Sequence, residues 1–189
     1  ESELGYNPYK MGIVAGADVH SGYSGNEEWD WKGAHGVSDD TPQKRLSPVP
    51  NASGEPGYVV SSAGTTCVWA TENTREGIWN GMMSKETYGT SGTLIRLRFF
   101  GGWNFPSDLD KDPEFVKIAY ESGVPMGQDL KEKRSSDKAP TFAIWAMKDP
   151  ESGNLDRIQI IKGWSNPKAN YPEEKIYDVA WSDNRVIDP

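Results

Sequence analysis

The chain has 189 residues, of which 35% are hydrophobic, and its formal net charge is −8. That length suits one domain or two small ones, and the acidic excess argues against binding a nucleic-acid backbone through a general basic field. The single cysteine, Cys67, excludes a disulfide within the chain, and no apolar run approaches the roughly 20 residues that a membrane-spanning helix needs.

The first predicted element is a short buried strand at residues 10–17, which ends just before Asp18, Val19 and His20. Residues i and i+2 of a strand point to the same side, so the Asp18 carboxylate and the His20 imidazole can meet at one point. These two donors together suit Zn, Mn or Fe. A catalytic zinc site usually has more protein ligands than two, so the pair predicts only part of a metal centre.

A long loop is predicted next, because residues 21–64 are rich in Gly, Ser, Pro and Asp and show no sustained period. Its candidate ligands are His35, Glu27, Glu28 and Asp30. The acids alternate with tryptophans, so the loop either supplies a ligand or grips a substrate, or it packs its rings and leaves its acids in water. For His35 the alternative is an ordinary exposed loop histidine.

A helix is predicted at residues 73–85, with Asn73 or Thr71 as its cap and Glu76 placed as in a capping box. Apolar residues at i,i+4 spacing predict the face that this helix turns inward. The pairs are Ile78 with Met82 and Trp79 with Met83.

From residue 93 onward the apolar period changes to two, which predicts half-buried strands near 95–99, 142–147, 158–160 and 177–181. A short helix is predicted at 112–120, with Pro113 at its first position. Arg96 and Arg98 share one face of the first of these strands, so they either bind an anion or mark its solvent side. The coarse expectation is an α/β start followed by an antiparallel β-sandwich.

Several longer stretches occur in a fixed order: Asn-Pro-Tyr-Lys-Met-Gly at 7–12, Gly-Ala-Asp-Val-His-Ser-Gly at 16–22, Arg-Phe-Phe-Gly-Gly-Trp at 98–103, and residues 69–76, 86–92, 123–130, 154–164 and 177–182. Together they resemble the bacterial family called domain of unknown function 3604, whose members are similar to the PHP metal-dependent phosphoesterases. The resemblance implies that residues 1–92 are the end of a PHP-like distorted barrel and that residues 93–189 are a β-sandwich-like region. The overall fold is then a β-rich α+β fold.

The same resemblance assigns a function to the acidic and imidazole pair. Asp18 and His20 fall on the final Asp-x-His metal motif of PHP proteins, which implies a divalent metal (Zn, Mn or Fe) and hydrolysis of a phosphoester in a small-molecule substrate. The earlier His-x-His motif is absent, so we expect a fragment whose remaining ligands lie upstream and which is inactive alone. Export to the periplasm or the outside is implied by the family.

Two other hypotheses compete with the hydrolase. In one, the chain is a non-catalytic ligand-binding or interaction module that carries a vestigial metal motif. In the other, it is a structural fragment that self-associates through an apolar surface normally covered by missing regions. No nucleic-acid partner and no membrane span are expected under any of the three.

Overall fold

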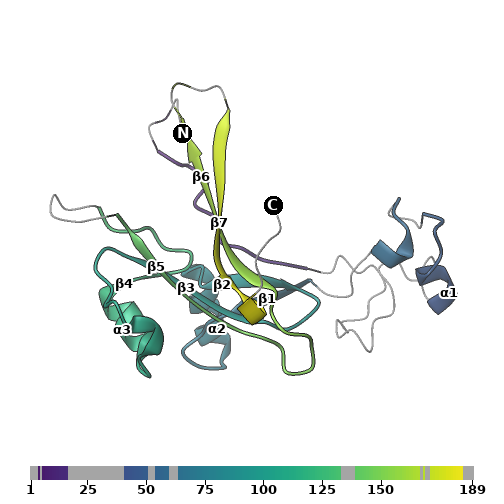
Figure 1. Cartoon of the computed structure of the whole chain (residues 1–189), viewed down its shortest axis with the longest axis horizontal. Helices are drawn as coiled ribbons and strands as arrows, with labels where there is room; N and C mark the ends of the chain where they lie inside the picture. Colours follow the sequence, from purple (N-terminus) through teal and green to yellow (C-terminus); the bar gives the residue numbers. More distant parts are fainter. Residues whose placement is uncertain are drawn as a thin grey trace. The chain divides into compact units, whose positions relative to one another are not determined.

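The computed structural model describes residues 4, 6–16, 41–50, 54–59, 64–132, 139–166, 168 and 171–184 (Figure 1). The chain divides into two units, Met11–Asp149 and the combination of Glu1–Lys10 with Pro150–Pro189. We call Met11–Asp149 the large unit and the other the small unit, and we describe each by itself. Among the described residues, no helix has the length and apolar character to cross a bilayer.

The large unit begins with an extended segment, Met11–Gly16, that is not part of any strand. The predicted buried strand at 10–17 is therefore wrong over its described part, since Met11, Ile13 and Val14 are exposed. The region predicted as a long loop contains two short helical turns, α1 (Pro42–Arg45) and η3 (Gly57–Val59). Thr41 caps α1 by accepting a hydrogen bond from the Lys44 N–H.

A two-stranded hairpin follows, in which β1 (Gly64–Val68) pairs antiparallel with β2 (Thr87–Ser91). The connection between them contains α2 (Arg75–Met83). Thr74 caps this helix, because its hydroxyl accepts the Gly77 N–H at 3.1 Å. The predicted helix is confirmed, but it starts after Thr71 and Asn73, so neither residue is its cap. It ends before Lys85, whose positive φ of 62° is incompatible with a further helical turn.

The buried face of α2 consists of glycines, not of the predicted apolar pairs. Gly77 and Gly81 are buried, whereas Trp79 and Met83 are 60% and 61% exposed. A Cβ at Gly81 would lie 2.6 Å from the Trp69 carbonyl oxygen, so the helix approaches the chain after β1 too closely for any side chain. The prediction of an inward Met and Trp stripe is therefore wrong. Helical spacing alone does not show that small residues define the packed face.

The second part of the large unit is a three-stranded antiparallel sheet of order β4-β3-β5, with α3 beside it (Figure 1). Its elements are β3 (Arg96–Gly102), η4 (Leu109–Lys111), α3 (Phe115–Ser122), β4 (Gly123–Pro125) and β5 (Thr141–Met147). The helix predicted at 112–120 is confirmed with a later start, because the Asp112 carboxylate accepts the Glu114 N–H at 2.8 Å and keeps Pro113 in a turn.

The core of the large unit lies between this sheet and α3. Phe100 (1% exposed), Leu109, Phe115 and Ala119 form a buried cluster, and Phe100 meets the ring of Phe115 edge-on at 6.0 Å. Phe100 belongs to the same face of β3 as Arg96 and Arg98, since side chains alternate along a strand. The strand face of Arg96 and Arg98, predicted either to bind an anion or to mark the solvent side, is therefore the core face at Phe100. On the other face, Phe99 stacks on Phe142 at 5.3 Å.

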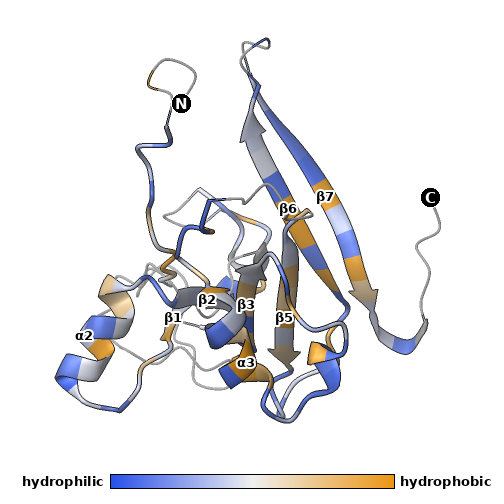
Figure 2. Ribbon diagram, turned by 90° about the vertical axis from the view of Figure 1, so that its left-hand side faces the viewer, coloured by the Kyte–Doolittle hydropathy of each residue, from blue (hydrophilic) through white to orange (hydrophobic). Residues whose placement is uncertain are grey.

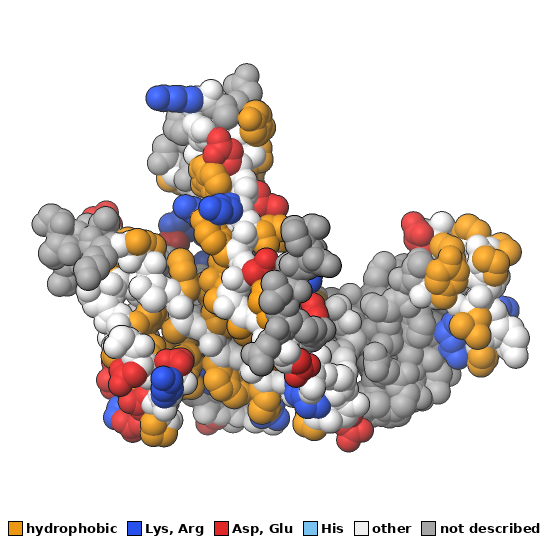
Figure 3. Space-filling model, in the orientation of Figure 1, with side chains coloured by type: hydrophobic (Ala, Val, Ile, Leu, Met, Phe, Trp, Pro, Cys, Tyr) orange, Lys and Arg blue, Asp and Glu red, His pale blue; other side chains and the backbone are white. Residues whose placement is uncertain are grey.

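The small unit contains the hairpin of β6 (Arg157–Ser165) and β7 (Pro172–Trp181), followed by the turn η5 (Ser182–Asn184). The last two predicted strands are therefore confirmed. Hydrophobic and hydrophilic residues both occur along each strand (Figure 2), and hydrophobic side chains lie at the hairpin surface (Figure 3). The described residues thus form a β-rich α+β fold, while a PHP-like barrel and a β-sandwich remain expectations.

Candidate functional site

The predicted metal pair, Asp18 and His20, lies outside the residues that the structure describes. The same is true of the loop candidates His35, Glu27, Glu28 and Asp30. Within the described ranges, no group of three or more His, Cys, Asp and Glu side chains is placed to hold a metal ion. The metal site therefore stays a prediction, and the described chain bears on it through the segment that ends at Gly16.

That segment lies across one face of the β1–β2 hairpin. Gly64 and Thr66 of β1 share this face with Gly89, which is the cross-strand partner of Thr66. A Cβ at Gly64 would lie 2.3 Å from the Gly16 carbonyl oxygen, and a Cβ at Gly89 would lie 2.7 Å from the Ala15 Cβ. The glycines therefore leave the space that the segment occupies.

Two threonines on the same face fix the backbone of the segment. The Thr66 hydroxyl accepts the Ala15 N–H at 2.9 Å and donates to the Ala15 carbonyl at 2.7 Å. The buried hydroxyl of Thr87 donates to the Ile13 carbonyl at 2.6 Å. These bonds explain why the segment is extended without being a strand, since its partners are side chains and not a neighbouring backbone. The chain is thus held in place just before Asp18.

A second constellation centres on Arg98, which is half-buried on β3. Its guanidinium carbon lies 3.6 Å from the centroid of the Trp69 ring, within the range of a strong cation–π contact. The Trp69 ring is itself fixed, because its Nε1 donates to the Leu97 carbonyl at 2.8 Å. The Trp69 backbone N–H also donates to the Glu86 carbonyl at 2.9 Å. The cation therefore stacks on a ring that one hydrogen bond orients, while a second holds the Trp69 backbone.

A phenol hydroxyl links this cation to a carboxylate. Arg98 Nη1 donates to the Tyr120 hydroxyl at 3.3 Å, and that hydroxyl donates to Glu86 Oε2 at 2.5 Å. Burial, and then the hydrogen bond and negative charge of Glu86, raise the pKa of Tyr120, while Arg98 opposes this shift. Tyr120 therefore stays protonated and can donate at neutral pH.

A second tyrosine, Tyr88, lies beside the same tryptophan, with ring centroids 6.4 Å apart. Burial, and then a hydrogen bond with the Cys67 thiol, raise the pKa of Tyr88. The charge of Arg96 acts in the opposite direction. Cys67 is half-buried here as the cross-strand partner of Tyr88.

Sequence reasoning noted the arginine pair but missed its partners. Tyr120 is 34 residues from Glu86 and 22 residues from Arg98 along the chain. Local periodicity carries no information about contacts over such separations. The only local signal was the placement of two arginines on one strand face.

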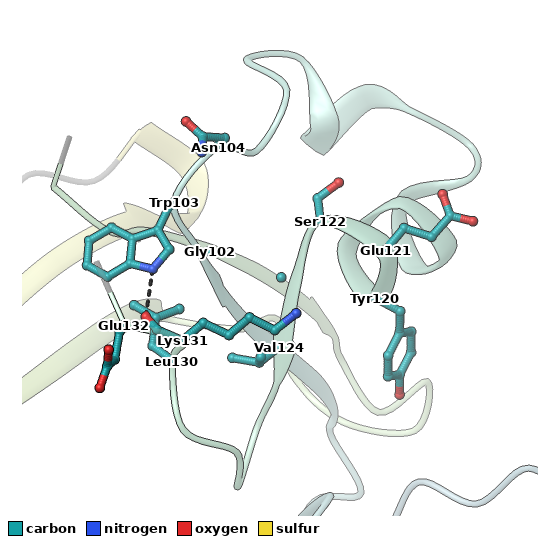
Figure 4. Close-up of a pocket in the computed structure, with 11 residues that line it drawn as sticks. Gly102, Trp103, Asn104, Tyr120, Glu121, Ser122, Val124, Leu130, Lys131 and Glu132 are labelled. Carbon is teal, nitrogen blue, oxygen red and sulfur yellow. Dashed lines mark hydrogen bonds between the residues drawn. The ribbon is translucent and has the colours of Figure 1, made fainter. Parts of the chain in front are cut away.

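A shallow cavity of about 230 Å³ lies beside β3, β4 and the end of α3 (Figure 4). Trp103 lies on one side of it and Glu121 and Ser122 lie on the other (Figure 4), while the Trp103 Nε1 donates to the Lys131 carbonyl at 2.9 Å. Its volume is below that of the pockets that usually enclose organic ligands. The described lining has charges of both signs but no nucleophile in contact with a base. The cavity is therefore a weaker candidate for a functional site than the residues around Arg98.

The sequence model of a family described as "Protein of unknown function (DUF3604)" matches residues 1–189. Comparison with curated proteins gives no match. Comparison with solved structures gives no match either.

Proposed function

The chain belongs to the DUF3604 family, and from that premise we propose that it is part of a metal-dependent hydrolase that acts on phosphoesters. The proposal assigns Asp18 and His20 as ligands to one divalent ion, Zn, Mn or Fe. Their carboxylate and imidazole donors fit those metals. The resemblance of Asp18-Val19-His20 to the PHP metal motif supplies the substrate class.

The observation that carries the proposal is the attachment of Ala15 to Thr66. Both the N–H and the carbonyl of Ala15 are bonded to one hydroxyl, at 2.9 Å and 2.7 Å. A metal ligand must be held in a defined position, because small displacements of a reacting group reduce catalysis strongly. A backbone fixed three residues before the first ligand is the support that such a site requires.

In this proposal the chain contributes binding and orientation. A divalent ion supplies Lewis-acid activation of water and of the phosphoryl oxygen. Asp18 and His20 would hold the ion, and the face built from Thr66, Thr87 and the hairpin glycines holds the segment that precedes them. The division into a metal-binding part at 1–92 and a β-rich part at 93–189 accompanies this proposal as a prediction.

Metal content is the decisive measurement. The 189-residue chain is purified, loaded with Zn or Mn, freed of excess ion by gel filtration and analysed by mass spectrometry for bound metal. We expect bound metal in the parent chain, its loss in Asp18→Ala and His20→Ala, and its retention in the control Tyr171→Phe, which removes an exposed phenol. Equal metal content in the parent and in both variants would refute the assignment.

A second candidate function, an interaction module, is favoured by the small unit. Ile161 and Ile176 are cross-strand partners in the β6–β7 hairpin and are 63% and 52% exposed. A two-stranded hairpin is marginally stable without further packing, and an exposed apolar pair is a natural contact surface. This hypothesis predicts concentration-dependent association in sedimentation that Ile161→Glu abolishes. Sedimentation as a monomer at all concentrations would argue against self-association.

A further inference from the structure

The guanidinium of Arg98 is held in a fixed orientation. Its guanidinium lies 3.6 Å from the centroid of the Trp69 ring, and the ring is tied to Leu97 through its Nε1. Stacking covers one face of the planar cation but leaves the N–H groups at its edge directed sideways. Arg98 is half-buried, so that edge is oriented before any ligand arrives. An oriented cation loses less conformational entropy on binding than a mobile one.

The guanidinium of Arg98 has more hydrogen-bond donors than described acceptors. The guanidinium has several N–H donors in one plane. In the described part of the chain, the Tyr120 hydroxyl is the one acceptor recorded for them, at 3.3 Å. Glu86 is the nearest carboxylate in this network, yet it accepts its hydrogen bond from Tyr120 at 2.5 Å and forms no ion pair with Arg98 among the described residues. Donors on a fixed cation are therefore still available.

A second positive charge, that of Arg96, lies near Arg98. Arg96 lies two residues before Arg98 on the same face of β3, and its charge reaches Tyr88 next to Trp69. Glu86 is the one carboxylate bonded into this network among the described residues, and two guanidinium groups accompany it. The chain as a whole carries a charge of −8. The sign of the charge at this network is therefore opposite to that of the whole chain.

Arg157 in the small unit provides a comparison inside the same molecule. Its guanidinium also lies over a tryptophan, 5.2 Å from the Trp181 ring centroid, but it forms an ion pair with Asp156 at 3.3 Å. The stacked arginine of the small unit thus has its own counter-ion, whereas the one acceptor of Arg98 in the described part of the chain is a neutral phenol. A structural role in a cation–π contact accounts for the position of Arg157, whose charge is paired. The same role does not account for the charge of Arg98, which is unpaired among the described residues.

We propose that Arg98, stacked on Trp69 and flanked by Arg96 and Tyr120, is a binding site for an oxyanion group, such as the phosphate or carboxylate of a small molecule. The planar fork of arginine matches both groups through paired hydrogen bonds. The Tyr120 hydroxyl orients Nη1, and Arg96 adds attraction from the same strand. This site is independent of the metal pair and goes beyond the hydrolase proposal.

The test is a titration of the full 189-residue chain with inorganic phosphate and, in parallel, with acetate, at low ionic strength and pH 7. Binding is read by NMR from the indole N–H signal of Trp69 and from the side-chain signal of Arg98. We expect saturable shifts with at least one anion. A stronger response to phosphate assigns a phosphoryl group as the ligand, and a stronger response to acetate assigns a carboxylate.

The variants separate a binding role from a structural one. Arg98→Lys keeps the charge but loses the fork and should weaken binding about tenfold, since charge-assisted paired hydrogen bonds are lost. Arg98→Gln should abolish binding, and Arg157→Gln, the matched control, should leave it unchanged. Tyr120→Phe removes the hydroxyl that orients Nη1 but keeps the cation on Trp69, so binding should weaken without being lost. The proposal is overturned if the parent shows no saturable shift, if Arg98→Gln binds as the parent does, or if folded Tyr120→Phe loses binding completely.

Discussion

Thr66 binds both backbone polar groups of Ala15 with one hydroxyl, since its Oγ1 accepts from the Ala15 N–H at 2.9 Å and donates to the Ala15 carbonyl at 2.7 Å. No backbone of a neighbouring strand provides these partners. The Thr66 side chain therefore supplies the hydrogen bonds that a neighbouring strand would supply in a sheet.

Replacing Thr66 by valine should lower the free energy of unfolding by about 1–3 kcal/mol, because both partly buried backbone groups of Ala15 lose their partner. The matched control is Thr90→Val on the opposite face of the same hairpin, where the buried Thr90 Oγ1 has no hydrogen-bond partner in the described structure. Removing an unsatisfied hydroxyl should be neutral or stabilising. Urea unfolding of both variants checks this, and equal losses would contradict the assigned role of Thr66.

Gly64→Ala should destabilise the large unit by about 1–3 kcal/mol, because the new methyl group would meet the Gly16 backbone. The relevant distance is 2.3 Å to the Gly16 carbonyl oxygen, which no rotamer change can relieve. Gly16→Ala is the control, since a Cβ there has no neighbour within 4 Å. Thermal unfolding should show a lower Tm for Gly64→Ala alone. A parallel fall in Gly16→Ala would mean that backbone freedom, and not contact, is responsible.

Gly81→Ala sets helix propensity against packing. In an exposed helix the change would stabilise by about 1 kcal/mol. Here the Cβ would lie 2.6 Å from the Trp69 carbonyl oxygen and 2.7 Å from Val68 Cγ1, so we expect net destabilisation. Trp79→Ser on the exposed face of α2 should change the unfolding free energy by less than about 0.5 kcal/mol. A more stable Gly81→Ala protein would show that α2 does not pack as described.

The raised pKa of Tyr120 predicts how stability depends on alkaline pH. Burial, and then Glu86, favour the neutral phenol in the folded state. The resulting stabilisation is complete below the ordinary tyrosine pKa of about 10 and is lost as the pH rises through the higher folded-state value. The urea midpoint of the parent should therefore fall more steeply from pH 9 to 11.5 than that of Tyr120→Phe. Tyr171→Phe, which removes an exposed phenol, should follow the parent.

The sequence predicted element types well where apolar residues repeat locally, as in β3, β5, β6, β7 and α3. It failed where contact partners are distant in the chain. Ile13 and Val14 suggested a buried strand, but their segment is held by threonines more than 50 residues away. Phe99 and Phe100 are equally apolar, and only the position of α3 decides that Phe100 is the core residue.

The candidate functional residues show the same contrast between local patterns and distant contacts. Asp18 and His20 stay a predicted metal pair, which rests on a local pattern and lies outside the described residues. The setting of Arg98 was not predicted, because Trp69, Glu86 and Tyr120 come from other parts of the chain. An arginine on an amphipathic strand looks alike in sequence whether water or a tryptophan ring covers it.

The attachment of Ala15 to Thr66 also affects how the protein can evolve. The two residues are 51 positions apart. The entropy of closing a flexible loop grows only with the logarithm of its length, so doubling that stretch would cost only about 0.6 kcal/mol. We therefore expect insertions and deletions after His20 and before Gly64 to leave the attachment of Ala15 to Thr66 largely unchanged.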